Sequence, residues 1–198
     1  MSPAPDDQAA ATSPAVAAAR DLPILRPARP ADVRAIAELV RPFAERRILV
    51  SKDLIAYFED VQEFTVAELP PAPGAERPTG IEPGRIVGCG ALHVMWDDIA
   101  EIRTLAVDPR LGGRGVGSAL LRSLIIRARS LDLQRLFCLT FEVGFFKRHG
   151  FQEISGMPVG TDAFAEIVRS YDDGVAEFLD LARAKPNTLG NTRMLLEL

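Results

Sequence analysis

A glycine-rich stretch, Leu111-Gly-Gly-Arg-Gly-Val-Gly117, is the part of this sequence best suited to hold a ligand. It follows a strand-like apolar run, Glu101 to Val107, and precedes an apolar helix-like run. Glycines let the backbone approach a ligand closely, and the unpaired N–H groups of a first helical turn carry partial positive charge. The arrangement therefore predicts a phosphate site, to which Arg110 and Arg114 could add charge-assisted contacts.

Two familiar phosphate loops do not fit this stretch. The nucleoside triphosphate loop, GxxxxGK[ST], matches the spacing of Gly112 and Gly117 but has Ser118 where the lysine should stand. The dinucleotide pattern GxGxxG also fails, because Gly113 and Gly115 are followed by Ser118 at the third glycine position. A plain glycine turn remains the simplest alternative to a ligand site.

The strand before the glycines carries two charged residues that could do chemistry. With a period of two, Glu101, Arg103, Leu105 and Val107 are expected on one face of this strand. A carboxylate and a guanidinium two residues apart could then face the same cleft. The alternatives are an exposed charge at the strand end for Glu101 and a simple ion pair between the two side chains.

The composition excludes several classes of protein. The chain has 198 residues, of which 47% are hydrophobic and 25% charged, as in a globular protein with an ordinary core. A net charge of −4 argues against nucleic acid as a partner. Cys89 and Cys138 lack the spacing of a metal cluster, and we expect no metal and two buried thiols in a reducing cytoplasm. No segment is long and apolar enough to suggest a membrane partner.

The hydrophobic periodicity predicts an α/β protein built on one mixed sheet. Residues 1–21, rich in Ala, Pro and Ser, are expected to form a disordered tail ahead of a single domain over 22–198. The expected strands are 22–26, 63–67, 85–94, 101–107, 136–140, one that begins at Gly150-Phe151, and 192–198. Two helices are expected to begin near Val33 and Ser51, and two more to cover about 118–131 and 145–149. Further helices are expected to form an insertion at about 161–184. This insertion would add a core layer or, alternatively, form a lid or a homodimer face.

The glycine stretch resembles the acyl-coenzyme A loop of the GNAT superfamily of N-acetyltransferases, [QR]xxGx[GA]. Gly115 and Gly117 match its glycines, Val107-Asp-Pro109 precedes it as in that family, and Phe145–Phe151 is similar to the family segment YxxxGF. Gly112 departs from the Gln/Arg position. The resemblance implies a mostly antiparallel sheet of about seven strands, with acyl-CoA between two splayed strands. It also implies that the coenzyme is bound by Leu105, Ala106, Val107, Gly112, Gly113, Arg114, Gly115, Val116, Gly117, Ser118 and Phe146.

Within this superfamily the chain looks most like the short single-domain N-acetylglutamate synthases of actinobacteria. The similarity lies in three stretches, Ile48–Leu54, Val87–Thr104 and Lys185–Met194, and in Phe146, which stands where many relatives have a proton-donating tyrosine. Longer members of that family carry an amino-acid-kinase-like domain, for which we see no room here. Feedback by arginine through such a domain is therefore not expected.

The resemblance also implies a reaction and a set of roles. Acetyl-CoA would acetylate the α-amino group of L-glutamate or L-glutamine, the first step of arginine biosynthesis, with Glu101 as base and Thr140 as the acid that meets the thiolate. The thioester carbonyl would be polarised by a backbone N–H near Leu105 or Ala106. The substrate would be held by Lys52, Arg103, Asn187, Asn191 and Arg193. The alternatives are a GNAT enzyme for another amine (a protein N-terminus, a polyamine or an antibiotic) and an inactive CoA-binding regulator.

Overall fold

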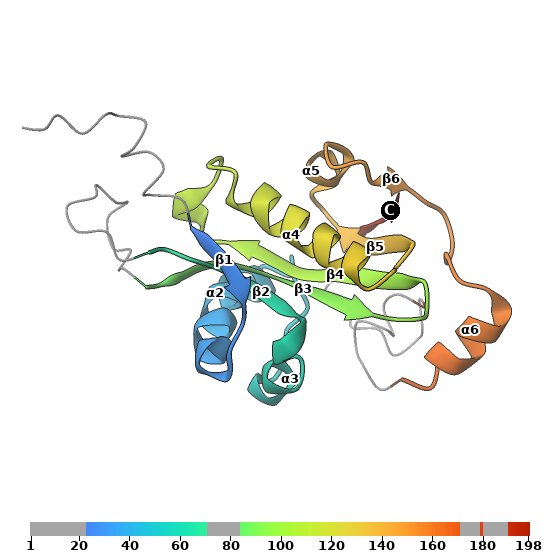
Figure 1. Cartoon of the computed structure of the whole chain (residues 1–198), viewed down its shortest axis with the longest axis horizontal. Coiled ribbons are helices and arrows are strands. Elements are labelled where there is room, and N and C mark those ends of the chain that lie inside the picture. Colours follow the sequence, from blue (N-terminus) through green and yellow to red (C-terminus); the bar gives the residue numbers. More distant parts are fainter. Residues whose placement is uncertain (1–22, 71–83, 171–178, 180–189) are drawn as a thin grey trace, which may run out of the picture.

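A computed structural model describes residues 23–70, 84–170, 179 and 190–198. Within these ranges seven strands form one sheet in the order β1-β2-β3-β4-β5-β7-β6 (Figure 1). Every neighbouring pair is antiparallel except β4 and β5, which run parallel. The strands are β1 (Ile24–Pro27), β2 (Phe64–Glu68), β3 (Ile86–Val94), β4 (Ile99–Val107), β5 (Arg135–Thr140), β6 (Gln152–Glu153) and β7 (Thr192–Glu197). The mixed, mostly antiparallel sheet predicted from the sequence is confirmed.

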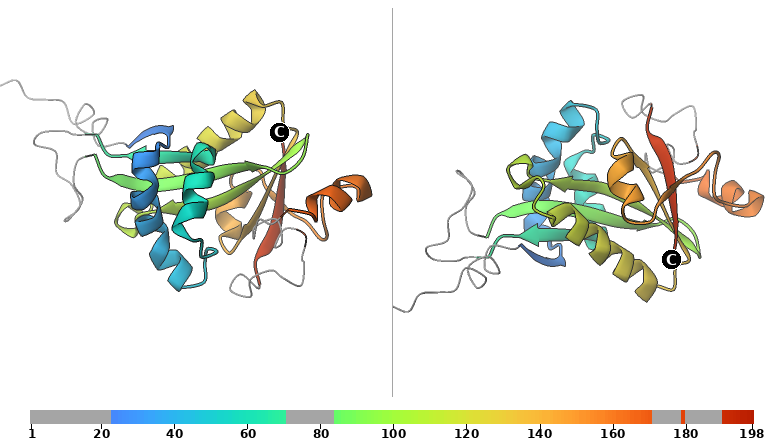
Figure 2. Two further views of the ribbon diagram at one scale, coloured as in Figure 1. Left: turned by 90° about the horizontal axis from the view of Figure 1, so that it is seen from below. Right: turned by 90° about the horizontal axis from the view of Figure 1, so that it is seen from above.

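Helices cover both faces of the sheet. Helices α4 (Val116–Ser130) and α5 (Val143–Lys147) lie on one face, and α2 (Val33–Glu45) and α3 (Leu54–Glu59) lie on the other (Figure 2). Helix α6 (Thr161–Ile167) lies at the right-hand end of the molecule in Figure 1, on the opposite side from β1. In the part of the chain that the structure describes, three short 3-10 turns connect the larger elements: η1 (Pro30–Asp32), η2 (Val61–Glu63) and η3 (Pro109–Leu111).

The helices form where an apolar stripe can be buried against the sheet. Val33, Ile36 and Val40, spaced three and four residues apart, are the buried positions of α2. On α4 the buried stripe is Leu120, Leu121, Leu124 and Ala128, with Ile125 only partly buried beside it. These contacts build a core on each face of the sheet.

The predicted insertion is partly described. Helix α6 buries Ala163 and Ile167 against Ile99 and Phe137 of the sheet, and Leu179 joins the same cluster. The described part of the insertion therefore adds a layer of core. The remainder of 161–184 lies partly outside the described residues, and the predicted tail, residues 1–21, lies wholly outside them.

The parallel pair β4–β5 is short, and this shapes the middle of the sheet. Only Ile99–Glu101 pair in register with Arg135–Phe137. Both strands continue beyond these pairs, β4 to Val107 and β5 to Thr140, without a ladder between them. The sheet is therefore split at its centre beyond Glu101.

A bulge in β4 changes which side chains share a face. Cys89 pairs with Ala106 and Ala91 with Arg103, so two residues, Thr104 and Leu105, stand opposite one. Thr104 has a φ of 55°, an uncommon backbone conformation for a β-branched residue.

The expectation that Glu101, Arg103, Leu105 and Val107 share one face is therefore wrong. The extra residue of the bulge reverses the alternation after Arg103. Leu105 and Val107 pack in the clusters on the α4 side, whereas Ala106 packs in the cluster of α2 and α3. Glu101 and Arg103 stand opposite His93 and Ala91, on the same face as Ala106.

The close packing of α4 on β3 depends on a residue without a side chain. A Cβ built at Gly88 would lie 2.9 Å from Leu120 Cδ1 and 3.3 Å from Val116 Cγ1. Gly88→Ala should therefore lower the free energy of unfolding by about 1–3 kcal/mol through overpacking, measured by urea denaturation. Gly144→Ala is the control, because a Cβ there meets only the tip of Arg148 at 3.8 Å. Equal stability of the two variants would contradict the packing described.

Candidate active site

A cavity of roughly 230 Å³ opens where β4 and β5 separate. Its walls come from β4, β5, α4, α5, the segment between α2 and α3, and the residue before β7, so that parts far apart in the sequence meet there. Several predicted site residues lie together in it. The lining residues are Ile48, Leu49, Val50, Lys52, Glu101, Ile102, Arg103, Thr104, Leu105, Val107, Gly117, Leu139, Thr140, Phe141, Glu142, Phe145, Phe146 and Asn191.

Glu101 and Arg103 form a buried ion pair in the wall of this cavity. Their exposed fractions are 5% and 8%. Both Nε and Nη2 of Arg103 contact the same carboxylate oxygen, Oε2 of Glu101, at 3.1 and 2.9 Å. Among the described residues Oε1 of Glu101 has no hydrogen-bond donor, so this oxygen is placed to accept a proton from a ligand. The ion pair considered as the simple alternative is thus present, and it lies inside the cavity.

Thr140 ends β5 at the opposite side of the cavity. The hydroxyl oxygen Oγ1 accepts a hydrogen bond from the backbone N–H of Glu142 at 2.9 Å. A hydroxyl that accepts in this way keeps its own proton for donation, and donation is strengthened when the oxygen already accepts. Thr140 is thus placed to donate a hydrogen bond into the cavity.

The predicted substrate-binding residues are only partly brought together. Lys52 lines the cavity, with its Nζ held 2.8 Å from Asp60 Oδ2, and Asn191 lines it from the position just before β7. Arg193 does not line it; its guanidinium lies 5.8 Å from the ring centroid of Phe137. Asn187 is outside the described residues.

The glycine turn leads directly from η3 into α4. Gly115 is the N-cap of α4 with a φ of 80°, and Gly113 has a φ of 74°. At neither position would a Cβ meet another atom within 4 Å, so glycine is needed here for the backbone conformation. The N-cap residue has no side chain, so it cannot cap the first turn of the helix. The backbone N–H groups of Val116, Gly117 and Ser118 therefore donate no hydrogen bond to an N-cap side chain.

Asp108 organises the start of this turn. Its carboxylate accepts hydrogen bonds from the backbone N–H of Arg110 at 3.0 Å and from the Arg110 side chain at 2.9 and 2.6 Å. Arg110 is therefore engaged with Asp108, and Arg114 is the exposed cation within the glycine turn. The side-chain hydrogen bonds from Arg110 hold the pKa of Asp108 below its ordinary value.

Of the predicted coenzyme residues, Leu105, Val107, Gly117 and Phe146 line the cavity. The side chain of Ala106 is buried on the opposite face of the bulge. Gly112, Gly113, Arg114, Gly115, Val116 and Ser118 form the turn and the first residues of α4 beside Gly117.

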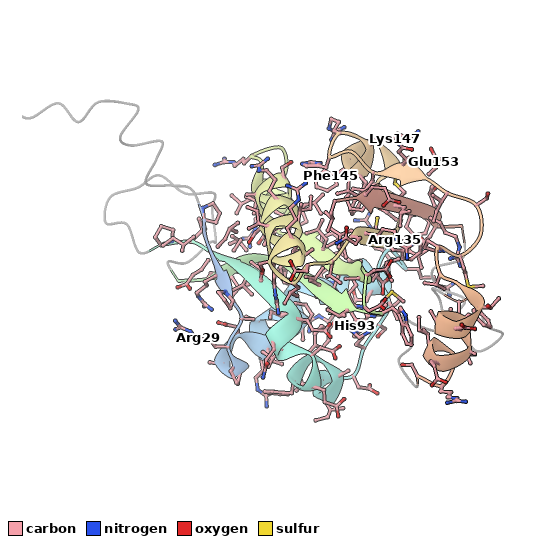
Figure 3. All side chains as sticks on the ribbon, turned by 45° about the vertical axis from the view of Figure 1, so that its right-hand side comes forward. Arg29, His93, Arg135, Phe145, Lys147 and Glu153 are labelled. Atoms are coloured by element: carbon pink, nitrogen blue, oxygen red, sulfur yellow. The ribbon has the colours of Figure 1, made fainter. Side chains whose placement is uncertain are left out.

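Sequence reasoning missed several lining residues. Phe145 comes from α5 and faces the start of α4, where a Cβ at Gly117 would lie 3.6 Å from its ring (Figure 3). Its neighbour Phe146 is only 5% exposed and packs edge-on against Phe151. The residues Ile48, Leu49 and Val50 stand in a stretch that the sequence analysis singled out, and their apolar run is the signal that could have found them.

Two further features of the described residues bear on ligands. No group of three or more His, Cys, Asp or Glu side chains within the described ranges could hold a metal ion. Across the same ranges, none of the helices has the length and apolar character needed to cross a lipid bilayer.

Comparison with known proteins gives a consistent result. The family model described as Acetyltransferase (GNAT) family matches residues 43–151. The chain is 54% identical over 176 residues to an amino-acid acetyltransferase of Mycobacterium tuberculosis. The match covers 89% of this chain and 95% of the relative.

Solved structures agree with the sequence comparison. A Mycobacterium tuberculosis protein crystallised in complex with CoA and NLQ superposes with a TM-score of 0.78 at 54% identity, over 89% of this chain and 99% of the other. The N-acetylglutamate synthase of Neisseria gonorrhoeae, complexed with coenzyme A and N-acetyl-glutamate, gives a TM-score of 0.65 at 25% identity. This match covers 88% of the present chain and 35% of the synthase chain.

The role of Asp108 predicts a pH-dependent stability. Because the pKa of Asp108 is lowered from its ordinary value of 3.8, its contribution is fully present above that value and is lost as the pH falls through the depressed pKa. Asp108→Asn should lower the free energy of unfolding by about 1–3 kcal/mol at neutral pH, and the difference from the parent should shrink below about pH 4. Urea denaturation at several pH values measures this.

Asp97→Asn is the control, because Asp97 is exposed. It should leave the stability within about 0.5 kcal/mol of the parent at every pH. A constant difference between Asp108→Asn and the parent down to pH 2 would contradict the role given to the carboxylate.

Proposed function

Because the chain belongs to the acetyltransferase (GNAT) family, we propose that it transfers the acetyl group of acetyl-CoA to the α-amino group of L-glutamate or L-glutamine. In arginine biosynthesis this is the first step, and the proposal places the protein in the cytoplasm. One observation carries the proposal: a single cavity beside the glycine turn combines Glu101, Arg103, Lys52 and Thr140.

The shape of the site suits acetyl-CoA. The glycine turn and the uncapped start of α4 offer backbone N–H groups to a pyrophosphate, as helix N-termini commonly do. The cavity continues from Gly117 along Val107 and Leu105, an apolar wall suited to a pantetheine arm. Acetyl-CoA supplies the activated acetyl group as a thioester. The side chains of this protein supply the base, the groups that bind the acceptor and the hydrogen-bond donor for the thiolate.

The acceptor must lose a proton before it can react. The α-amino group of a free amino acid is largely protonated at neutral pH, so a base has to remove one proton. Glu101 fits this role because it lines the cavity while Arg103 engages its Oε2. The neutral amine then attacks the carbonyl carbon, and the C–S bond breaks as the C–N bond forms.

Two basic side chains of the cavity are suited to bind the carboxylates of an anionic acceptor. Arg103 and Lys52 bring two cations to its walls, and a guanidinium can bind a carboxylate through two parallel hydrogen bonds. Each cation also has a carboxylate partner of this protein, Glu101 or Asp60, which fixes its position. Glu101 and Glu142 also line the cavity, so the preference for an anionic acceptor rests on the hydrogen-bond donors of Arg103 and Lys52 and not on a net positive charge.

The departing thiolate needs a hydrogen-bond donor. Phe146 has no proton to give, and its ring is packed in the core. Thr140 brings a hydroxyl to the cavity at the end of β5, and its oxygen already accepts a hydrogen bond from the backbone N–H of Glu142. We therefore assign to Thr140 the donation of a hydrogen bond, or of a proton relayed through water, to the sulfur.

The acceptor can be identified with purified full-length protein and a panel of amines. We expect free thiol to be released from acetyl-CoA with glutamate or glutamine, and much more slowly with polyamines or N-terminal peptides. Glu101→Gln should lower kcat by about 10²–10⁴-fold, because it removes the general base. Glu153→Gln is the control, since Glu153 forms an exposed ion pair with Lys147 (Figure 3) and neither residue lines the cavity.

Two outcomes would contradict the proposal. Thiol release that is faster with cationic amines would indicate another acceptor class. Tight CoA binding without turnover for any amine would indicate a CoA-binding regulator.

The glycine turn predicts a change in coenzyme affinity. Gly115→Ala places a side chain at a φ of 80°, which costs about 1–2 kcal/mol and distorts the turn. The dissociation constant for CoA, measured by calorimetry, should rise about tenfold. Gly156→Ala imposes the same strain at a φ of 83°, also with nothing within 4 Å, but away from the cavity. Equal affinities of the two variants for CoA would exclude the turn as the pyrophosphate site.

A further inference from the structure

The bulge in β4 is held from both faces by residues of β3. Thr104 and Leu105 stand opposite Gly90, and both line the cavity. A backbone with a φ of 55° at a threonine is strained and persists only where its surroundings impose it. The contacts of Cys89 and Gly90 show what imposes it here.

On one face, Cys89 contacts the backbone of the bulge directly. Its side chain is fully buried, and its Sγ donates a hydrogen bond to the carbonyl oxygen of Thr104 at 3.5 Å. Burial raises the pKa of the Cys89 thiol to about 12, against an opposing hydrogen bond from the backbone of Ala106. The sulfur therefore keeps its proton at physiological pH and acts as a donor.

On the other face, Gly90 leaves room for Leu105. A Cβ at Gly90 would lie 2.9 Å from Cδ1 of Leu105 and 2.9 Å from Cδ1 of Leu124. Leu105 thus lies directly over Gly90 and against α4. The Thr104–Leu105 peptide is fixed between the thiol on one side and this packing on the other.

The direction of that peptide follows from its planarity. In a trans peptide the carbonyl and the following N–H point in opposite directions, and the described residues contain no cis peptide. The Thr104 carbonyl points towards Cys89 on β3. The Leu105 N–H therefore points away from β3, towards the gap between β4 and β5.

We propose that Cys89 is a positioning residue for acetyl transfer, whose S–H···O contact with Thr104 aims the Leu105 N–H at the thioester carbonyl. The inference rests on the acetyl transfer proposed above but not on the identity of the acceptor. A donor fixed in advance stabilises the negative charge that develops on the carbonyl oxygen, and loss of such a donor costs about 10²–10³ in kcat. Loss of its positioning, with the donor still present, should cost less.

Three variants separate this role from simple packing. Cys89→Ala removes the donor, and Cys89→Ser keeps a shorter donor in the same place. Cys138→Ala is the matched control, because Cys138 is an equally buried thiol, pairs with Met194 of β7, and does not line the cavity. We expect kcat to fall about tenfold in Cys89→Ala with little change in the KM for acetyl-CoA. Cys89→Ser should recover part of this loss, and Cys138→Ala should stay within about twofold of the parent.

A second readout needs no acceptor and no turnover. The ¹³C resonance of acetyl-CoA labelled at the thioester carbonyl reports how strongly that carbonyl is polarised in the binary complex. The parent, Cys89→Ser and Cys138→Ala should shift it downfield of free acetyl-CoA, and Cys89→Ala should lose most of the shift. The result stands even if the acceptor is not an amino acid.

Two results would overturn the proposal. One is a carbonyl resonance in Cys89→Ala identical to that of the parent at saturating acetyl-CoA. The other is an equal fall in kcat for Cys89→Ala and Cys138→Ala, which would show that only core packing had been lost.

Discussion

The separation of two parallel strands at the centre of the sheet is the constraint on which the rest of this structure depends. β4 and β5 share a ladder only over Ile99–Glu101 and Arg135–Phe137. Beyond it, the backbone groups that would have paired across the gap are available to a ligand. Helices α4 and α5 and the α2–α3 segment surround the gap, so the opening becomes a walled cavity rather than an exposed sheet edge.

Buried charge is tolerated in this cavity because each charged group has a partner. Glu101 is paired with Arg103, and Lys52 with Asp60. A buried charge without such a partner would cost several kcal/mol. The pairs also fix positions: Arg103 engages one oxygen of Glu101, a side chain that lines the cavity. Thr140 is arranged in a similar way. Its oxygen accepts a hydrogen bond from the backbone N–H of Glu142, which leaves the hydroxyl proton for donation to a ligand.

The features that could be predicted from the sequence are those with a local signal. The glycine turn, the helix after it and the order of strands and helices along the chain followed from spacing. The resemblance carried by Gly115, Gly117 and Phe145–Phe151 indicated the family. The bulge could not be predicted, because Thr104 is neither glycine nor proline and its run alternates like a regular strand. Only pairing with β3, through Cys89 and Gly90, shows that Leu105 lies on the opposite face from Arg103.

A crystal structure of the full chain with acetyl-CoA would test the central claim most directly. We expect the pyrophosphate on the N–H groups between Gly113 and Ser118, the pantetheine arm in the gap between β4 and β5, and the thioester beside Leu105 and Glu101. A coenzyme bound outside this gap, with β4 and β5 joined by a continuous ladder, would contradict the account.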